Sequence, residues 1–220
     1  RLQGPYAKLG ELCQEERALS EAAGEVEDPE AFVCLPDAAK GLYADAVEGR
    51  TPLAPPWKAL RFVETRPSAW SVRLHAALRT DDGWFVLPDV ATLVRGTAGT
   101  TESVTRLSAQ VEPLLASGWP EVVLEVETRW VVIEEGVELE SETHRVEFLC
   151  GVGPSGIPAC TGALPRATVA RRHAPGEAES TRWTVERRTT PEGLLVLEGD
   201  REALDEPAAA VLGAHRIEFR

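Results

Sequence analysis

Residues 122–133 read VVLEVETRWVVI, and this stretch decides the fold class. Its apolar residues Leu124 and Val126 alternate with Glu125 and Glu127. Alternation with a period of two is typical of a β-strand that has one buried face and one polar face. The stretch therefore predicts a long strand, and similar segments lie on both sides of it.

Most of the remaining chain also predicts strands joined by short turns. Alternation or β-propensity marks residues 72–79, 84–87, 103–111, 144–150, 181–188, 194–197 and 215–219. Residues 103–111 also fit a helical period, but their Thr and Val content favours a strand. Turn signals lie at 82–83, 134–136 and 191–193, and Pro88 predicts the end of a strand. We therefore expect a mainly β fold, an antiparallel β-sandwich or open barrel, with an α+β fold as the alternative.

Residues 1–56 predict a helical N-terminal segment ahead of a β domain at 57–220, the two forming one compact unit. Pro5 can open a helix that buries Leu9 and Leu12 and turns residues 15–17 to water. Asp28 and Pro29 can begin a second short helix through residues 32–34. Residues 53–56, which read LAPP, predict a stiff connector into the β domain.

The four cysteines form two local pairs, Cys13 with Cys34 and Cys150 with Cys160. Zinc sites commonly use a CxxC pair, and the sequence has none, so disulfides are favoured over a metal. Disulfides indicate an oxidising compartment. We expect the first bridge to close the helical segment on itself and the second to close a hairpin loop.

The string Gly151-x-Gly153-x-x-Gly156 matches a dinucleotide-binding fingerprint as text. That fingerprint requires a helix to begin at the motif, so that the helix N-terminus can meet the phosphates. Pro154 and Pro158 prevent a regular helix there. The sequence therefore predicts a loop, with no cofactor.

Charge and composition limit the partners and the location. The formal net charge of −13 argues against nucleic acid and leaves a basic protein, a cation or no particular partner, with solubility as the favoured explanation of the charge. No apolar run is long enough to span a membrane. The chain has no Met and few Lys, which suggests a GC-rich bacterial genome and an export signal or lipid anchor ahead of Arg1. We expect a periplasmic, outer-membrane-surface or secreted protein.

An acidic run at residues 121–147 is the least generic feature besides the cysteines. Five of its carboxylates are candidates for binding a basic partner: Glu134, Glu135, Glu138, Glu140 and Glu142. The structural alternative is pairing with arginines across the sheet, and it is favoured. The candidate arginines are Arg166, Arg171, Arg172, Arg182, Arg187 and Arg188.

No catalytic motif accompanies the four histidines, His75, His144, His173 and His215, which we expect to be surface or hydrogen-bonded structural residues. The leading hypothesis is an exported non-enzymatic binding or structural protein, of which the soluble part of a bacterial lipoprotein is one form. The alternatives are a lipophilic-ligand carrier with a β-enclosed cavity, an inhibitor or immunity-type protein with an acidic hairpin, and a hydrolase built on His144 and nearby glutamates.

Overall fold

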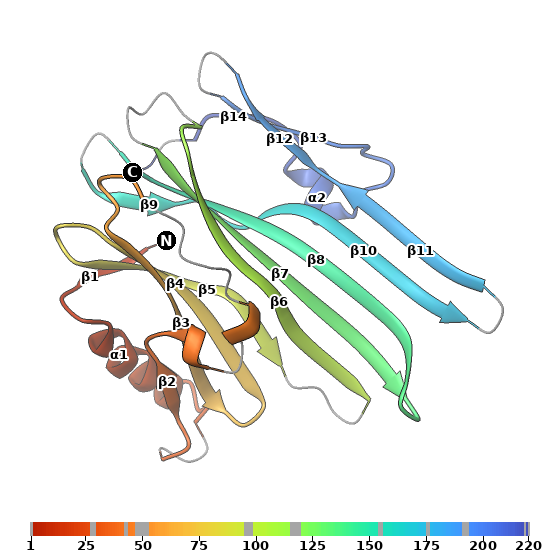
Figure 1. Ribbon diagram of the computed structural model, residues 1–220, viewed down its shortest axis with the longest axis horizontal. Helices are drawn as coiled ribbons and strands as arrows, with labels where there is room; N and C mark the ends of the chain where they lie inside the picture. The colour runs from red at the N-terminus through yellow and green to blue at the C-terminus, as the bar shows by residue number, and fades with distance from the viewer. Residues whose placement is uncertain are drawn as a thin grey trace.

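The chain folds into antiparallel sheets, seen in a computed structural model (Figure 1). The structure describes residues 2–26, 30–41, 44–46, 53–94, 99–114, 120–153, 156–174, 177–190, 194–217 and 219. Within these residues there are three sheets, two α-helices and two short 3-10 helices, at Ala38–Lys40 and Ala44–Ala46. The predicted mainly β, antiparallel fold with a short disulfide-linked helix near the N-terminus is confirmed.

The N-terminal sheet has the strand order β1-β5-β4-β3-β2. Its strands are β1 (Gln3–Tyr6), β2 (Val33–Leu35), β3 (Ala59–Ser68), β4 (Ser71–Arg79) and β5 (Trp84–Val94). Helix α1 (Leu9–Ala22) connects β1 to the segment that leads into β2. The two short strands from the first 35 residues are therefore the edges of a sheet whose centre is formed by β3, β4 and β5.

The long sheet has the order β11-β10-β8-β7-β6 and curves into a half-barrel (Figure 1). Its strands are β6 (Thr100–Glu112), β7 (Glu121–Glu134), β8 (Val137–Val152), β10 (Leu164–Ala174) and β11 (Glu177–Thr184), and the short β9 (Pro158–Cys160) pairs with β8. β7 and β8 are joined by the predicted turn, where Glu135 and Gly136 both have positive φ angles, 51° and 81°. This geometry is that of a two-residue hairpin turn.

The C-terminal sheet is small and packs beside the long sheet. It has the order β12-β13-β14, with β12 (Glu186–Thr189), β13 (Leu195–Glu198) and β14 (Gly213–His215). Helix α2 (Glu206–Ala210) lies between β13 and β14, and the side chain of Asp205 caps it by accepting a hydrogen bond from the Ala208 backbone N–H at 2.9 Å. The sequence interpretation did not include this helix.

Three apolar clusters hold the layers together. The largest lies between the N-terminal and long sheets and includes Leu74, Leu78 and Leu124. A second lies between α1 and the opposite face of the N-terminal sheet, and a third between the long sheet and the C-terminal sheet with α2. The order of layers is therefore α1, N-terminal sheet, long sheet, and C-terminal sheet with α2. Strands β3 to β8 all contribute side chains to the largest cluster, so each of them is covered on at least one face.

The predicted helical hairpin at the N-terminus is wrong in two respects, the residue at which its first helix begins and the placement of Cys34 in a second helix. Pro5 lies in β1, where Tyr6 pairs with Trp84, so the backbone there belongs to a ladder and α1 begins later, at Leu9. Cys34 lies in a strand, paired with Thr65 of β3, instead of a second helix. The predicted start of that helix, residues 28–29, lies outside the described residues.

The first disulfide therefore has a different role from the one predicted. Cys13 on α1 is bonded to Cys34 on β2, with Cα atoms 5.7 Å apart, so the bridge attaches the helix to the edge of the sheet. Cys150 is bonded to Cys160, which is also its register partner in β9, so this bridge closes a hairpin loop as predicted. The described chain has no free cysteine.

Two predictions about β4 and β5 are also wrong. The alternation in residues 72–79 predicts one wet face, but α1 covers the side of β4 on which His75 and Ala77 lie fully buried, and Arg79 at the strand end stays exposed. Pro88 does not end its strand, because β5 continues to Val94 after an irregularity in the ladder at Asp89, which has a φ of 50°. A bulge lets the strand carry a proline without losing its pairing beyond that point.

The C-terminal strand lies slightly earlier than predicted. β14 ends at His215, and Ile217 packs into the cluster beneath the C-terminal sheet. Phe219 is 5% exposed and lies against Gly151 of β8. The predicted turn at 191–193 lies outside the described residues, although β12 and β13 pair as a hairpin. The predicted boundary at residue 56 between helical and β parts stays a prediction.

Candidate functional site

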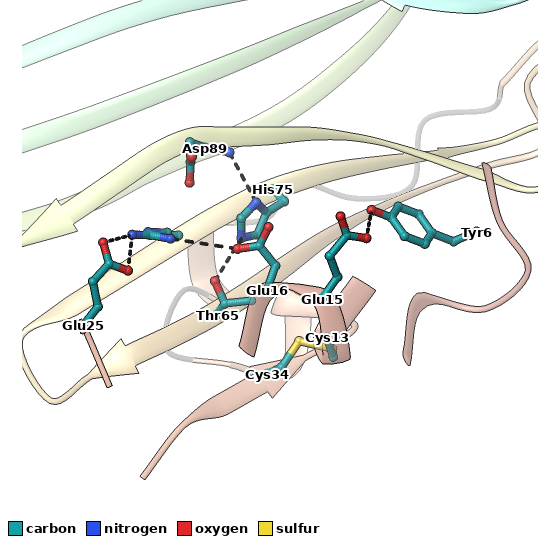
Figure 2. A network of polar contacts seen from close by, with 10 residues as sticks. Tyr6, Cys13, Glu15, Glu16, Glu25, Cys34, Thr65, His75 and Asp89 are labelled. Atoms are coloured by element: carbon teal, nitrogen blue, oxygen red, sulfur yellow. Dashed lines mark hydrogen bonds and ion pairs between the residues drawn. A yellow bond between two sulfur atoms is a disulfide. The ribbon is translucent and has the colours of Figure 1, made fainter. Parts of the chain in front are cut away.

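A buried polar network beneath α1 is the most unusual chemical feature of the fold (Figure 2). His75 of β4 contacts the Thr65 hydroxyl of β3, Nε2 to Oγ1, at 2.9 Å. Glu16 of α1 lies with its Oε2 atom 3.9 Å from the same Nε2 atom. Thr65, His75 and Glu16 are 1%, 0% and 4% exposed, so the network is sealed from solvent by the helix.

The hydrogen bonds of His75 fix its neutral tautomer. The backbone N–H of Asp89 donates to Nδ1 at 3.3 Å, so Nδ1 is an acceptor and the ring proton is on Nε2, which donates to Thr65. A histidine that activates a hydroxyl must accept its proton, which requires the opposite arrangement. Burial lowers the pKa of His75 to about 4, which keeps the ring neutral. This histidine is buried and hydrogen-bonded, so the other predicted alternative, a surface position, does not apply to it.

Charged side chains complete the network on both sides of the histidine. Arg73 of β4 binds both carboxylate oxygens of Glu25 at 2.5 and 2.6 Å and lies 3.9 Å from Glu16. Burial, followed by the nearby carboxylate of Asp89, raises the pKa of Glu16. These contacts attach α1 and the segment after it to β4.

Tyr6 and Glu15 extend the same attachment toward β1. The Tyr6 hydroxyl donates to Glu15 Oε2 at 2.7 Å, and burial together with this bond raises the pKa of Tyr6. Together with the Cys13–Cys34 disulfide, the network holds α1 on the sheet (Figure 2).

His144 forms a second Thr–His–Glu arrangement on the long sheet. Its Nδ1 atom lies 2.9 Å from Thr168 Oγ1 and its Nε2 atom 3.4 Å from Glu142 Oε1. Thr168 lies within a strand that is paired on both sides, with His144 and Trp183 as its neighbours. In a hydrolase, such an arrangement would use the Thr168 hydroxyl as the nucleophile, and nearby backbone N–H groups would form the oxyanion hole. Backbone N–H groups in a strand that is paired on both sides belong to the ladder, so the Thr168 N–H cannot form this hole.

The five candidate glutamates of the acidic run fall into two groups. Glu138 is bound by Arg129 at 2.8 Å, Glu140 by Arg172 at 2.8 Å, and Glu142 lies beside His144. Glu134 and Glu135 are exposed at the β7–β8 turn, and no ion pair to either is found within the described residues. The structure thus brings three of the candidates into contacts across the sheet and leaves two at the hairpin end.

Three of the six predicted arginine partners, Arg166, Arg172 and Arg187, pair with the acidic run. Arg187 of β12 contacts Glu147 at 3.0 Å and Glu112 at 3.2 Å, and Arg166 contacts Glu147 at 3.5 Å. Cross-strand pairs of opposite charge stabilise a sheet. The remaining predicted partners differ in placement. Arg188 pairs with Glu198, Arg171 lines a shallow cavity, and the side chain of Arg182 lies outside the described set.

The end of the β7–β8 hairpin carries two of the exposed large apolar side chains of the described residues, and the others are Leu19, Trp70 and Ile157. Ile133 is 38% exposed and Val137 59% exposed, and they flank Glu134 and Glu135. Among the described residues, none of those at 127–145 belongs to the three apolar clusters. The hairpin end therefore projects from the packed body, at the lower right of Figure 1. We name residues 133–137 the hairpin tip.

The cavities along the described chain are open to solvent and lined largely by polar side chains. One of about 280 Å³ lies over β7, β8 and β10, one of about 260 Å³ lies beside Trp130 and Arg172, and one of about 440 Å³ lies beside Trp183 and Glu198. The space between the N-terminal and long sheets is occupied by the largest apolar cluster.

The glycine string has a packing role. A Cβ atom on Gly151 would overlap the Phe219 ring, and one on Gly153 would overlap the Phe219 carbonyl oxygen. Gly151 belongs to β8, and Gly156 donates its N–H to Gly153 in a turn. The motif makes room for the C-terminal segment, and no helix begins in its described residues.

Sequence reasoning missed the residues that form the buried network. Glu16 was expected to point to water, but it follows Leu12 by four positions and precedes Ser20 by four, and all three lie on the buried face of α1. That spacing was the available signal. Thr65 and Arg73 carried no local signal, because their roles depend on the pairing of β3 with β4.

The chain has no match among the known proteins with which it was compared. No protein-family model matches the chain, and no curated protein or solved structure is similar to it. In the described part of the chain, no cluster of three His, Cys, Asp or Glu residues could hold a metal ion. None of its helices is long and apolar enough to cross a membrane.

Proposed function

We propose that this protein is an exported, non-enzymatic binding protein that docks a basic protein through its hairpin tip. The observation that supports this most directly is the combination of exposed Ile133 and Val137 with exposed Glu134 and Glu135. Apolar side chains that stay exposed on a folded protein often mark an interaction site. The carboxylates beside them supply the charge that selects a partner.

The tip combines apolar and charged side chains, and protein interfaces likewise contain both kinds. A negative tip on a protein of net charge −13 attracts a positive surface and speeds its association. The three other candidate carboxylates, Glu138, Glu140 and Glu142, act inside the sheet. Glu138 and Glu140 contact Arg129 and Arg172 on neighbouring strands of the long sheet, and Glu142 lies beside His144 on its own strand.

The alternatives receive less support. An enclosed lipophilic ligand needs an apolar cavity, whereas the cavities described above are open and charged. A hydrolase centred on His144 needs an oxyanion hole, which Thr168 does not provide. An inhibitor or immunity-type protein is a specific form of the proposal, in which the basic partner is an enzyme.

The location is part of the same proposal. Two disulfides are compatible with an extracytoplasmic compartment. We place the protein in the periplasm, at the outer-membrane surface or outside a bacterial cell, as a lipoprotein or a secreted protein. The bacterial source is supported by the bias toward Arg over Lys in the sequence.

Selection from a random peptide library displayed on phage tests the proposed binding. The selected peptides should be rich in Lys, Arg and apolar residues, and as synthetic peptides they should bind the wild-type protein. Binding should weaken at least about tenfold in a Glu134→Lys/Glu135→Lys variant, the loss of one charge-assisted contact or more. An Ile133→Ser/Val137→Ser variant should weaken it as well.

The matched control is Asp82→Lys/Glu202→Lys, which changes the net charge equally at exposed positions away from the tip. Binding to this control should be within about twofold of wild type. Selection of no peptides, or of peptides that bind all variants equally, would contradict the proposal. Unfolding curves of each variant separate a loss of binding from a loss of fold.

A further inference from the structure

The cavity on the outer face of the long sheet contains buried polar atoms without hydrogen-bond partners. Arg145 Nε and Arg166 Nη1 are shielded from solvent, and neither atom makes a hydrogen bond within the described residues. Both side chains line the cavity of about 280 Å³. Buried polar atoms without partners are rare in folded proteins, so a ligand that accepts hydrogen bonds from these two N–H groups would be stabilised there.

The spacing of these atoms leaves room for a bridging group. Arg145 Nε lies 4.0 Å from Glu125 Oε1, beyond hydrogen-bond distance, and Arg166 Nε lies 3.5 Å from Glu147 Oε1. Burial lowers the pKa of Arg166, which agrees with a guanidinium that is incompletely compensated by its neighbours. A group that accepts hydrogen bonds, such as a carboxylate, would satisfy the Arg145 Nε and Arg166 Nη1 donors.

The charges around the cavity define the kind of molecule. Three of the carboxylates that line the cavity form ion pairs, Glu125 with Arg106, Glu127 with Arg145 and Glu147 with Arg187, and none is found for Glu186 within the described residues. An anionic group of a ligand therefore fits the two guanidinium N–H groups, and a cationic group fits Glu186. A molecule that carries both charges can place its carboxylate toward the arginines and its ammonium toward the exposed Glu186 at the rim.

We propose that this cavity binds a small zwitterion of the class of free α-amino acids. The volume is slightly below the lower end of the range for small-molecule sites, about 300–1,000 Å³, and suits a ligand of that size. Arg166 and Arg145 bind its carboxylate, and Glu186 binds its ammonium group. The site is separate from the hairpin tip and does not depend on the proposed function.

Titration of the folded protein with individual L-amino acids, followed by ¹H–¹⁵N NMR, tests this proposal. At about 10 mM ligand, above the 1 mM range of weak binding, at least one amino acid should shift the amide signals of residues 143–147, 166–169 and 184–186. Acetate and methylamine, which carry one charge each, should not shift them at the same concentration.

Variants assign the binding to the cavity. Glu186→Gln, at an exposed position where folding should be unaffected, should lower the affinity for the amino acid at least about fivefold. Arg166→Met should lower it at least about tenfold. Arg172→Gln at the neighbouring cavity should leave the affinity unchanged. No shift with any amino acid would overturn the proposal and leave water as the occupant. Equal binding of acetate, or affinity unchanged in Glu186→Gln and Arg166→Met, would also overturn it.

Discussion

Glu16 of α1 and His75 of β4 face each other beneath the helix, Oε2 to Nε2 at 3.9 Å, and both side chains are nearly excluded from solvent. Burial shifts the pKa values of these groups in opposite directions, downward for the histidine and upward for the glutamate. Each therefore favours its neutral form in the folded state. The attachment of α1 to the sheet is consequently weakened by acid, which protonates His75, and by a higher pH, which ionises Glu16.

His75 should make the protein less stable in acid. The unfolded chain binds a proton at His75 below pH 6.5, whereas the folded protein resists protonation until about pH 4. Its contribution is fully present above pH 6.5 and is lost as the pH falls toward 4, up to about 3 kcal/mol. Urea unfolding between pH 4 and 7.5 should show this loss in wild type and a smaller one in His75→Gln. An identical pH dependence in the variant would contradict the prediction.

Glu16 should act in the opposite direction. A raised pKa means that the folded state holds a proton that the unfolded state has released, so stability falls as the pH rises from 4.5 through the folded pKa. Relative to wild type, Glu16→Gln should therefore gain free energy of unfolding as the pH rises from 4.5 to 7. The same urea series measures it. A constant difference between the two proteins across this range would show that Glu16 does not titrate differently on folding.

Loss of the first disulfide should loosen α1 specifically. Cys13 and Cys34 are 21 positions apart, and removal of a crosslink of this length costs about 3 kcal/mol. In Cys13→Ala/Cys34→Ala, amide hydrogen exchange in α1 should rise more than in the long sheet. The matched variant is Cys150→Ala/Cys160→Ala, which should lower stability while leaving α1 protected. Equal exchange of α1 in both variants would argue that the bridge does not secure the helix.

Arg187 should be the most important arginine for stability. Its side chain is 11% exposed and binds both Glu147 and Glu112, and its removal leaves the buried Glu147 carboxylate undercompensated. Arg187→Met should lower the free energy of unfolding by about 3 kcal/mol. Arg188→Met, at an exposed pair with Glu198, should cause no measurable change. Thermal unfolding of the two variants compares them, and equal melting temperatures would refute the assignment.

The turn at the hairpin tip depends on a glycine. Gly136 has a φ of 81° and no atoms within 4 Å of the position a Cβ would take, so Gly136→Ala should cost about 1 kcal/mol through the backbone alone. Gly10, in α1 with similar free space, provides the control. Gly10→Ala should stabilise by about 0.5 kcal/mol. A neutral Gly136→Ala would mean that the turn adapts.

The sequence predicts the strands of the long sheet well because their pattern has a direct physical cause. Leu124 and Val126 face the apolar cluster shared with the N-terminal sheet, while Glu125 and Glu127 face the opposite side of the long sheet. That alternation survives in any arrangement of the layers. The hairpin turn is equally local, because Gly136 accepts a backbone conformation that few residues adopt.

Features that depend on pairing between distant segments could not be predicted. Cys34 lies in a three-residue edge strand, whose existence depends on Thr65 and its neighbours in β3. The helical spacing from Leu12 indicates that Glu16 lies on the buried face of α1, but the histidine and the arginine of β4 beneath it could not be predicted locally. For the candidate site, the sequence proposes five glutamates, and their role in binding stays a prediction. The strand register was needed to show that Glu138 and Glu140 pair internally while Glu134 and Glu135 do not.

The ratio of two affinities tests the central claim most directly. It compares the binding of a selected basic peptide to Glu134→Lys/Glu135→Lys with its binding to Asp82→Lys/Glu202→Lys, at the same ionic strength. Docking at the hairpin tip predicts that the first variant binds at least about tenfold more weakly than the second. Equal affinities for the two variants, both folded, would contradict the account and place the interaction elsewhere on this acidic surface.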